Sequence, residues 1–161
     1  PLHEWGEGNA KTLYHLIKEV NKGMCALEIN KKKEVRRTMK IAKIMMVRGN
    51  MVLVESHVLP RGGVSKKGTW QLVSTKVREG EEPLDAAIRG VSHELQVQQP
   101  KIHHRFNLHH ETKFAPSYPG LPGYCEYFTF EGDAYAADLP LDDFQTIDAA
   151  GDTHYWTWRT R

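Results

Sequence analysis

The chain has 161 residues, of which 40% are hydrophobic and 26% charged, a composition that is ordinary for one globular domain. No apolar run approaches the roughly 20 residues of a membrane-spanning helix, which excludes that class of element. The formal net charge is only +2, but residues 1–70 hold 14 Lys/Arg against 6 Asp/Glu, whereas residues 71–161 hold 8 against 14. Because the chain begins at Pro1 without a methionine, we expect a fragment or a processed product.

The two cysteines, Cys25 and Cys125, lie far apart, and neither belongs to a C-x-x-C pair. Two cysteines are too few for a disulfide framework, and their spacing is not that of a zinc or redox site. The sequence therefore predicts reduced thiols and an intracellular protein, without a choice between cytoplasm, nucleus and organelle.

The first predicted element is a helix over residues 9–22, because Leu13, Leu16, Ile17 and Val20 recur at helical spacing. Apolar stretches then predict extended segments, and basic or glycine-rich stretches predict the turns between them. In chain order these are a strand over 25–29, a basic turn, a strand over 35–47, a tight turn at Gly49-Asn50, a strand over 51–54, a loop over 60–68 and an extended segment over 70–77.

The helix predicted over residues 83–97 has the clearest pattern. Pro83 suits the first helical position, acidic residues stand at the positive end of the helix dipole, and Pro100 follows the helix. The remaining segments are predicted strands over 102–114, 124–130 and 154–158, Pro-Gly turns over 117–123, and an acidic loop over 131–152 with at most one helical turn. A helix that falls between extended segments favours an α/β fold with a mixed sheet.

The 23 residues from Thr75 to Val97 resemble the Nudix box, the motif of the Nudix superfamily, whose pattern is G-x5-E-x7-R-E-U-x-E-E-x-G-U with U a bulky aliphatic residue. The matching positions are Glu81, Arg89, Val91, Glu94 and Val97. The resemblance implies a Nudix-like α/β/α sandwich with a mixed β-sheet. We expect a single domain over 1–161, in which 1–34 form an N-terminal helix and basic extension and 35–161 the Nudix core.

Four positions depart from the pattern. Thr75 stands where the family has its first Gly, Gly90 where it has the Glu after Arg, His93 where it has the first Glu of the pair, and Gln96 where it has the last Gly. In the family, residues at the positions of 90, 93 and 94 share one helix face and present three carboxylates. The resemblance implies that these hold divalent cations, which polarise a diphosphate and activate water. Because only Glu94 remains, we expect hydrolysis to be impaired.

If hydrolysis persists, the resemblance implies Mg²⁺ or Mn²⁺ held by Glu94, with His93 as an altered ligand. A carboxylate outside the box, Glu111 or Glu126, would then restore part of the lost charge. An imidazole beside a carboxylate suits Mn²⁺ or Zn²⁺ better than Mg²⁺. In the family, the counterparts of Glu81 and Arg89 brace the loop against the helix, which is a structural role.

Two histidine pairs, His103-His104 and His109-His110, form a second candidate metal site on a predicted strand. Adjacent strand residues face opposite sides, so each pair supplies one ligand to a shared centre. Polar strand positions that face solvent are the simpler interpretation.

Basic residues concentrate after the first predicted strand, at Lys31, Lys32, Lys33, Arg36 and Arg37. A long polyanion or an acidic protein face would dock there through its charge, and a solvated hairpin is the alternative.

Three functional hypotheses follow from these patterns. The first is a catalytically impaired Nudix-like domain that binds a nucleotide, the 5′ end of an RNA or a protein of a larger assembly. The second is a divalent-metal-dependent hydrolase that cleaves a nucleoside diphosphate linked to another moiety. The third is a structural subunit whose basic half contacts nucleic acid. No hypothesis includes a membrane partner.

Overall fold

The computed structural model describes residues 2–113 and 117–161, without the side chains of 66–69, 104–108 and 113. This part of the chain contains a 3₁₀ turn (Leu2–Glu4), two α-helices and a mixed sheet of nine strands. The helices are α1 (Leu13–Asn21) and α2 (Pro83–Leu95). The strands are β1 (Ala26–Ile29), β2 (Val35–Arg48), β3 (Met51–Leu59), β4 (Lys66–Gln71), β5 (Val73–Lys76), β6 (Ile102–Lys113), β7 (Gly123–Asp133), β8 (Phe144–Ile147) and β9 (Thr153–Thr160).

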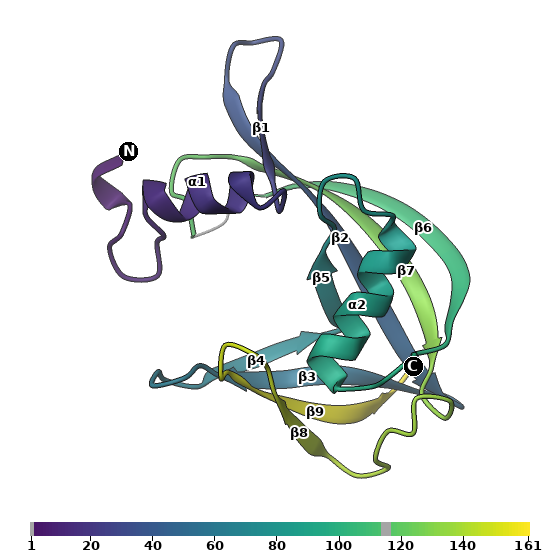
Figure 1. The fold of residues 1–161 in the computed structure, drawn as a ribbon. Helices are drawn as coiled ribbons and strands as arrows, with labels where there is room; N and C mark the ends of the chain where they lie inside the picture. Colours follow the sequence, from purple (N-terminus) through teal and green to yellow (C-terminus); the bar gives the residue numbers. More distant parts are fainter. Residues whose placement is uncertain (1, 114–116) are drawn as a thin grey trace.

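The long strand β2 organises the sheet (Figure 1). It has 14 residues and pairs with four other strands, antiparallel with β1, β3 and β5 and parallel with β7. The main strand order is β6-β7-β2-β3-β9-β8, and β4 pairs with β3. One parallel pair among antiparallel ones makes the sheet mixed, as the sequence predicts.

The two helices pack on opposite faces of the β2–β7 pair. Side chains alternate between the faces along a strand, so residues of opposite parity in β2 contact different helices. Ala42, Ile44 and Met46 of β2 belong to the core cluster that contains the buried residues of α2. Met39 faces the other way and packs with Leu16 of α1 in a second cluster. A mixed sheet with a helix on each face confirms the predicted α/β/α sandwich.

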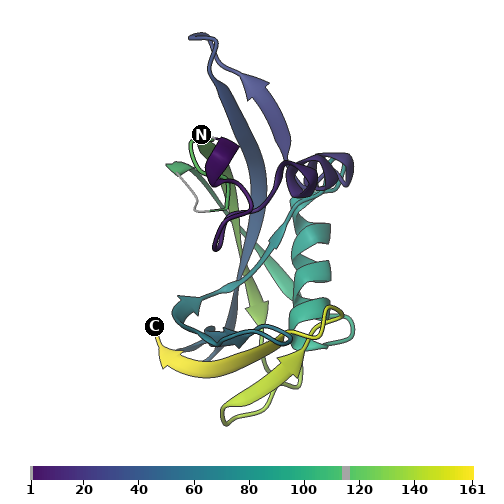
Figure 2. The ribbon, with the colours of Figure 1, turned by 90° about the vertical axis from the view of Figure 1, so that its left-hand side faces the viewer.

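A hairpin formed by β1 and the first residues of β2 projects beyond the rest of the sheet (Figures 1 and 2). All four residues of β1 are exposed, and Ile29 keeps 72% of its surface in solvent. The turn is closed by Asn30, whose side-chain oxygen accepts hydrogen bonds from the backbone N–H groups of Lys32 and Glu34. The basic turn is therefore presented to solvent at the end of an arm.

Both helices are shorter than the sequence predicts, for local reasons. Helix α1 begins at Leu13 instead of residue 9, because Thr12 and His15 form a capping box in which each side chain accepts from the other's backbone N–H. Helix α2 ends at Leu95 instead of residue 97, because Gln96 adopts a left-handed conformation with φ 57°.

Two short strands lie where the sequence predicts loops. β4 begins inside the predicted loop over 60–68, and β8 lies inside the acidic segment 131–152. In β8 only Thr146 is buried, and four residues are too few for a period-two signal. Among the described residues, no helix has the length and apolar character needed to cross a membrane.

Candidate functional site

The loop before α2 is fastened to the helix by Arg89. Its guanidinium donates to both carboxylate oxygens of Glu81, at 2.9 and 3.0 Å, and to the backbone oxygen of Lys76 at 2.7 Å. Glu81 also accepts from the backbone N–H of Arg78 at 2.9 Å. The hydrogen bond from Arg89 lowers the pKa of Glu81, which keeps the carboxylate ionised. This is the bracing arrangement that the resemblance implies for these two residues.

Thr75 of β5 and Gly90 of α2 pack directly against each other. A Cβ atom placed on Gly90 would lie 2.8 Å from Cγ2 and 3.0 Å from Cβ of Thr75, too close for carbon atoms. The family pattern has glycine at the first position and glutamate at the second, so the two positions have exchanged their bulk. A helical glycine costs about 1 kcal/mol relative to alanine, and the contact with Thr75 accounts for the absence of a side chain at this position. While Thr75 is present, position 90 has no room for a side chain.

Glu94, the carboxylate that remains in the box, lies in the last turn of α2 and meets residues of β3 and β9. Its Oε2 is 3.4 Å from Nδ1 of His154, and the same nitrogen is 2.7 Å from Oε2 of Glu55. The other ring nitrogen, Nε2, is 3.0 Å from Oδ2 of Asp148, which follows β8. One imidazole therefore contacts three carboxylates from segments that are far apart in the sequence.

The charges in this cluster depend on one another. The hydrogen bond with Glu55 raises the pKa of His154 to about 9, with burial opposing the shift and Asp148 adding to it. The two closest carboxylates therefore favour the protonated form of the ring. Burial raises the pKa of Glu94, and the positive charge of His154 opposes that shift while the charges of Glu55 and Asp148 add to it. The carboxylates thus gather around one internal cation.

Glu55, Asp148 and His154 lie outside the box, and sequence reasoning missed all three. One signal was present in the sequence. His154 alternates with Trp156 in a strand whose every second residue is buried at its start, so an ionisable side chain stands at an inward position. A buried ionisable group needs a partner, which points to a cluster without identifying its members.

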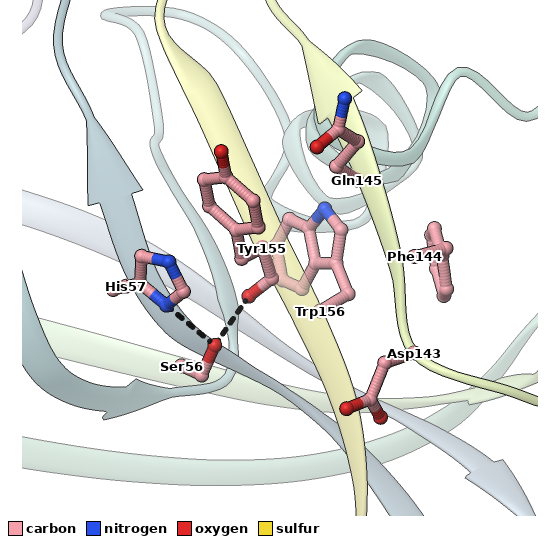
Figure 3. Close-up of a pocket in the computed structure, with 7 residues that line it drawn as sticks. All are labelled: Ser56, His57, Asp143, Phe144, Gln145, Tyr155 and Trp156. Carbon is pink, nitrogen blue, oxygen red and sulfur yellow. Dashed lines mark hydrogen bonds between the residues drawn. The ribbon is translucent and has the colours of Figure 1, made fainter.

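A separate shallow pocket of about 290 Å³ lies over β3, β8 and β9 (Figure 3). The rings of His57 and Tyr155 stack there with centroids 4.1 Å apart, and the Ser56 hydroxyl donates to the backbone oxygen of Tyr155 at 3.1 Å. Neither His154 nor any of the three carboxylate residues around its imidazole lines this pocket. The pocket and the Glu94 cluster are therefore distinct features.

The other predicted metal ligands are not placed beside Glu94. His93 is exposed on α2. Glu111 and Glu126 lie on β6 and β7, and Glu126 lines a pocket beside the loop that precedes α2, whereas Glu94 is at the helix end. Among the described residues, the ligand atoms that gather within 4.8 Å of one another with Glu94 belong to the β3 and β9 residues named above.

The second histidine pair of β6, His109-His110, contacts neighbouring aromatic rings. His109 stacks on Tyr127 and His110 on Tyr124, with ring centroids 6.0 and 5.5 Å apart. The Tyr124 hydroxyl also lies 2.7 Å from Nδ1 of His110. The side chain of His104 lies outside the described residues. Within the described part of the chain, no three ligand atoms gather at these pairs.

The basic residues predicted for partner binding separate into two environments. The lysines at 31–33 are exposed in the turn of the projecting hairpin. Arg36 pairs with Glu28 across the hairpin at 3.0 Å, and its guanidinium lies 4.7 Å from the centroid of the Tyr124 ring. For these residues, partner binding stays a prediction.

Arg37 is buried, with 5% of its surface exposed, and its Nη1 donates to Oε2 of Glu19 at 3.2 Å. Lys11 and Lys76 also contact Glu19. Burial alone would raise the pKa of Glu19, but the hydrogen bonds and charges of the two lysines lower it to about 2. The charge of Arg37 therefore serves an internal ion-pair network between α1, β2 and β5, and Arg37 is not part of the basic surface.

A larger pocket, of about 550 Å³, lies between the projecting hairpin and the loop before α2. Tyr124 and Lys40 contribute to it from β7 and β2, Arg36 extends over the Tyr124 ring, and Arg78 joins from the loop. Lys40 and Arg78 are exposed. Four glutamates also line the pocket, so it combines an aromatic ring with both signs of charge.

The Mg²⁺ site that the resemblance implies does not fit the residues of the box helix. Mg²⁺ takes oxygen ligands in near-octahedral geometry. Position 90 has no room for a carboxylate, His93 is exposed, and Glu94 contacts the imidazole of His154. The face that carries three carboxylates in the family carries one here.

Comparisons with known proteins place the chain in a family. The family model described as the NUDIX domain matches residues 36–158. The crystal structure of a NUDIX hydrolase from Nitrosomonas europaea is 16% identical, with 85% of this chain and 73% of that chain covered and a TM-score of 0.44. No curated protein matches the sequence. Because the family model spans well over half of its length, this chain belongs to the NUDIX-domain family.

Proposed function

We propose that this NUDIX domain binds a nucleotide and does not hydrolyse it by the Mg²⁺-dependent route of a complete Nudix box. The contact between Thr75 and Gly90 carries the first half of the proposal. It fills the space in which the family places a carboxylate, so the helix face lacks that ligand and has no room to regain it by one substitution.

The pocket between the hairpin and the box loop supports the second half of the proposal. Its volume of about 550 Å³ is in the range of small-molecule sites. Arg36, whose guanidinium lies over the Tyr124 ring, offers a planar surface for a base, and Lys40 and Arg78 offer exposed cations for phosphate groups. The four glutamates that line the pocket oppose a high density of phosphate, which favours a nucleotide over a long polyanion.

A hydrolysis assay tests the first half. The panel holds ADP-ribose, NAD, dinucleoside polyphosphates, nucleoside triphosphates and 5′-triphosphorylated RNA, each in Mg²⁺ and in Mn²⁺, beside a Glu94→Gln variant. We expect no product release, or equal release in both proteins. Turnover that disappears in the variant would establish the alternative, a divalent-metal-dependent hydrolase built around the carboxylates near Glu94.

A calorimetric titration with the same compounds tests the second half. We expect Lys40→Ala and Arg78→Ala each to weaken binding about tenfold, since a hydrogen bond to a charged group contributes roughly 1.5 kcal/mol or more. Lys31→Ala and Lys32→Ala remove the same charge outside the pocket and are the matched controls. If only the controls weaken binding, and triphosphorylated RNA binds with a steep dependence on salt, the basic hairpin is the binding surface and the pocket is not.

A further inference from the structure

Glu55, Glu94 and His154 bring three metal-ligating atoms together from three different elements. Oε2 of Glu55, Oε2 of Glu94 and Nδ1 of His154 are separated by 2.7 and 3.4 Å along the two contacts to the imidazole, and all three ligand atoms lie within 4.8 Å of one another. The Glu55 and His154 side chains keep 13% and 11% of their surfaces exposed, and Glu94 keeps 27%. The group is therefore partly enclosed and reachable from the side of α2.

The imidazole of His154 is held in the orientation that a metal ligand requires. Its Nε2 lies 3.0 Å from Oδ2 of Asp148, so Nδ1 is directed at the two glutamates. Asp148 is itself fixed, because its other oxygen accepts from the backbone N–H groups of Ala150 and Asp152 at 2.9 and 3.0 Å. A carboxylate that binds the second ring nitrogen is the usual outer partner of a metal-bound histidine.

We propose that Glu55, Glu94 and His154 form a site for a single transition-metal ion of the Zn²⁺ type, with Asp148 as the outer partner of the histidine. This site differs from the family's set of carboxylates on one helix, because two of its three ligands come from strands outside the box. It does not rest on the proposed nucleotide binding. The ion would tie the end of α2 to β3 and β9, and its binding would release the proton that Nδ1 of His154 shares with Glu55.

The donor set selects the class of metal. One imidazole and two carboxylates match the nitrogen and oxygen ligands of Zn²⁺ sites with three protein ligands and a water, whereas Mg²⁺ requires oxygen ligands and keeps several waters. With metal–ligand distances of about 2.0–2.2 Å, two tetrahedral ligands lie about 3.3–3.5 Å apart. The separation of 3.4 Å between His154 and Glu94 already has this value, and the 2.7 Å separation to Glu55 needs a small side-chain rotation.

The test is a titration of the EDTA-treated and dialysed full chain with Zn²⁺, followed by calorimetry and thermal unfolding. Co²⁺ in a parallel titration reports its ligands through visible absorption. We expect one equivalent of Zn²⁺ to bind, the Tm to rise, and excess Mg²⁺ not to compete. Glu55→Gln and Asp148→Asn are each expected to weaken Zn²⁺ binding about 10- to 100-fold. The Tm in EDTA checks that each variant is folded.

His93→Ala and His57→Ala are the matched controls, because they remove exposed or half-exposed histidines near the site and should leave Zn²⁺ binding unchanged. The proposal is overturned if no equivalent binds, if the folded Glu55 and Asp148 variants bind as the natural chain does, or if the control variants lose the ion. Zn²⁺ binding without turnover leaves both proposals standing. Turnover with Zn²⁺ bound at these residues would support this site. Such turnover would refute the proposed absence of hydrolysis only if Mg²⁺ or Mn²⁺ also supported the reaction.

Discussion

Gly90→Glu is expected to lower the free energy of unfolding by about 3 kcal/mol, although it restores the residue of the family pattern. The new Cβ would meet Thr75 at 2.8 Å, and overpacking of this kind costs about 1–3 kcal/mol. The carboxylate would also enter a buried position without an evident partner, which adds a cost of at least about 1 kcal/mol. Urea unfolding at pH 7 measures the change.

The Thr75→Gly background supplies the control, because it removes the atoms that occupy the space. Gly90→Ala should destabilise the natural chain but stabilise the Thr75→Gly variant by roughly 1 kcal/mol, the ordinary helix preference of alanine over glycine. A reversal of sign of this kind gives a coupling energy in a double-mutant cycle. Equal effects of Gly90→Ala in both backgrounds would show that Thr75 does not restrict position 90.

Glu19→Gln is expected to cost about 3 kcal/mol at pH 7, because it leaves the buried Arg37 without its carboxylate. The same substitution should change the response to acid. The pKa of Glu19 is about 2 in the folded protein and near 4.5 when the chain is unfolded. Since the folded pKa is the lower one, the contribution is fully present above pH 4.5 and is lost as the pH falls through about 2.

The measurement is urea unfolding of both proteins at several pH values from 7 down to 2. The difference between the natural chain and Glu19→Gln should shrink by roughly 2–3 kcal/mol across this range. Glu28→Gln is the matched control, since the Glu28–Arg36 pair is largely exposed and contributes less than about 1 kcal/mol. A difference that stays constant with pH would contradict the assigned role of Glu19.

Local spacing was sufficient to predict the helix of the box, and the family resemblance implied the two residues that brace it. Pro83 and the apolar face of α2 are signals contained within one element, and Arg89 and Glu81 are separated by only eight residues. β2 was predicted, over residues 35–47, because its apolar pattern is also contained within one element. β8 was not, because its stability depends on pairing with β9 and not on its own pattern.

The members of the site around His154 could not be predicted from local sequence patterns. Glu55 and His154 meet because β3 and β9 are neighbours in a register with a shift between Glu55 and His57. Periodicity gives the face of a strand but not its partner, so the contact was not predictable from either segment. The compensation of Gly90 by Thr75 likewise links a strand to a helix, and a single sequence shows the two departures without showing that they touch.

The position of β2 at the centre of the sheet also determines the order in which the fold is completed. β2 ends at residue 48, but its parallel neighbour β7 is not available until residues 123–133 have been synthesised. Closing so long a stretch of chain is entropically costly, which makes such pairings slow to form. During translation the edge of β2 that pairs with β7 therefore stays without this partner until residues 123–133 have emerged, and an unpaired strand edge favours wrong pairing.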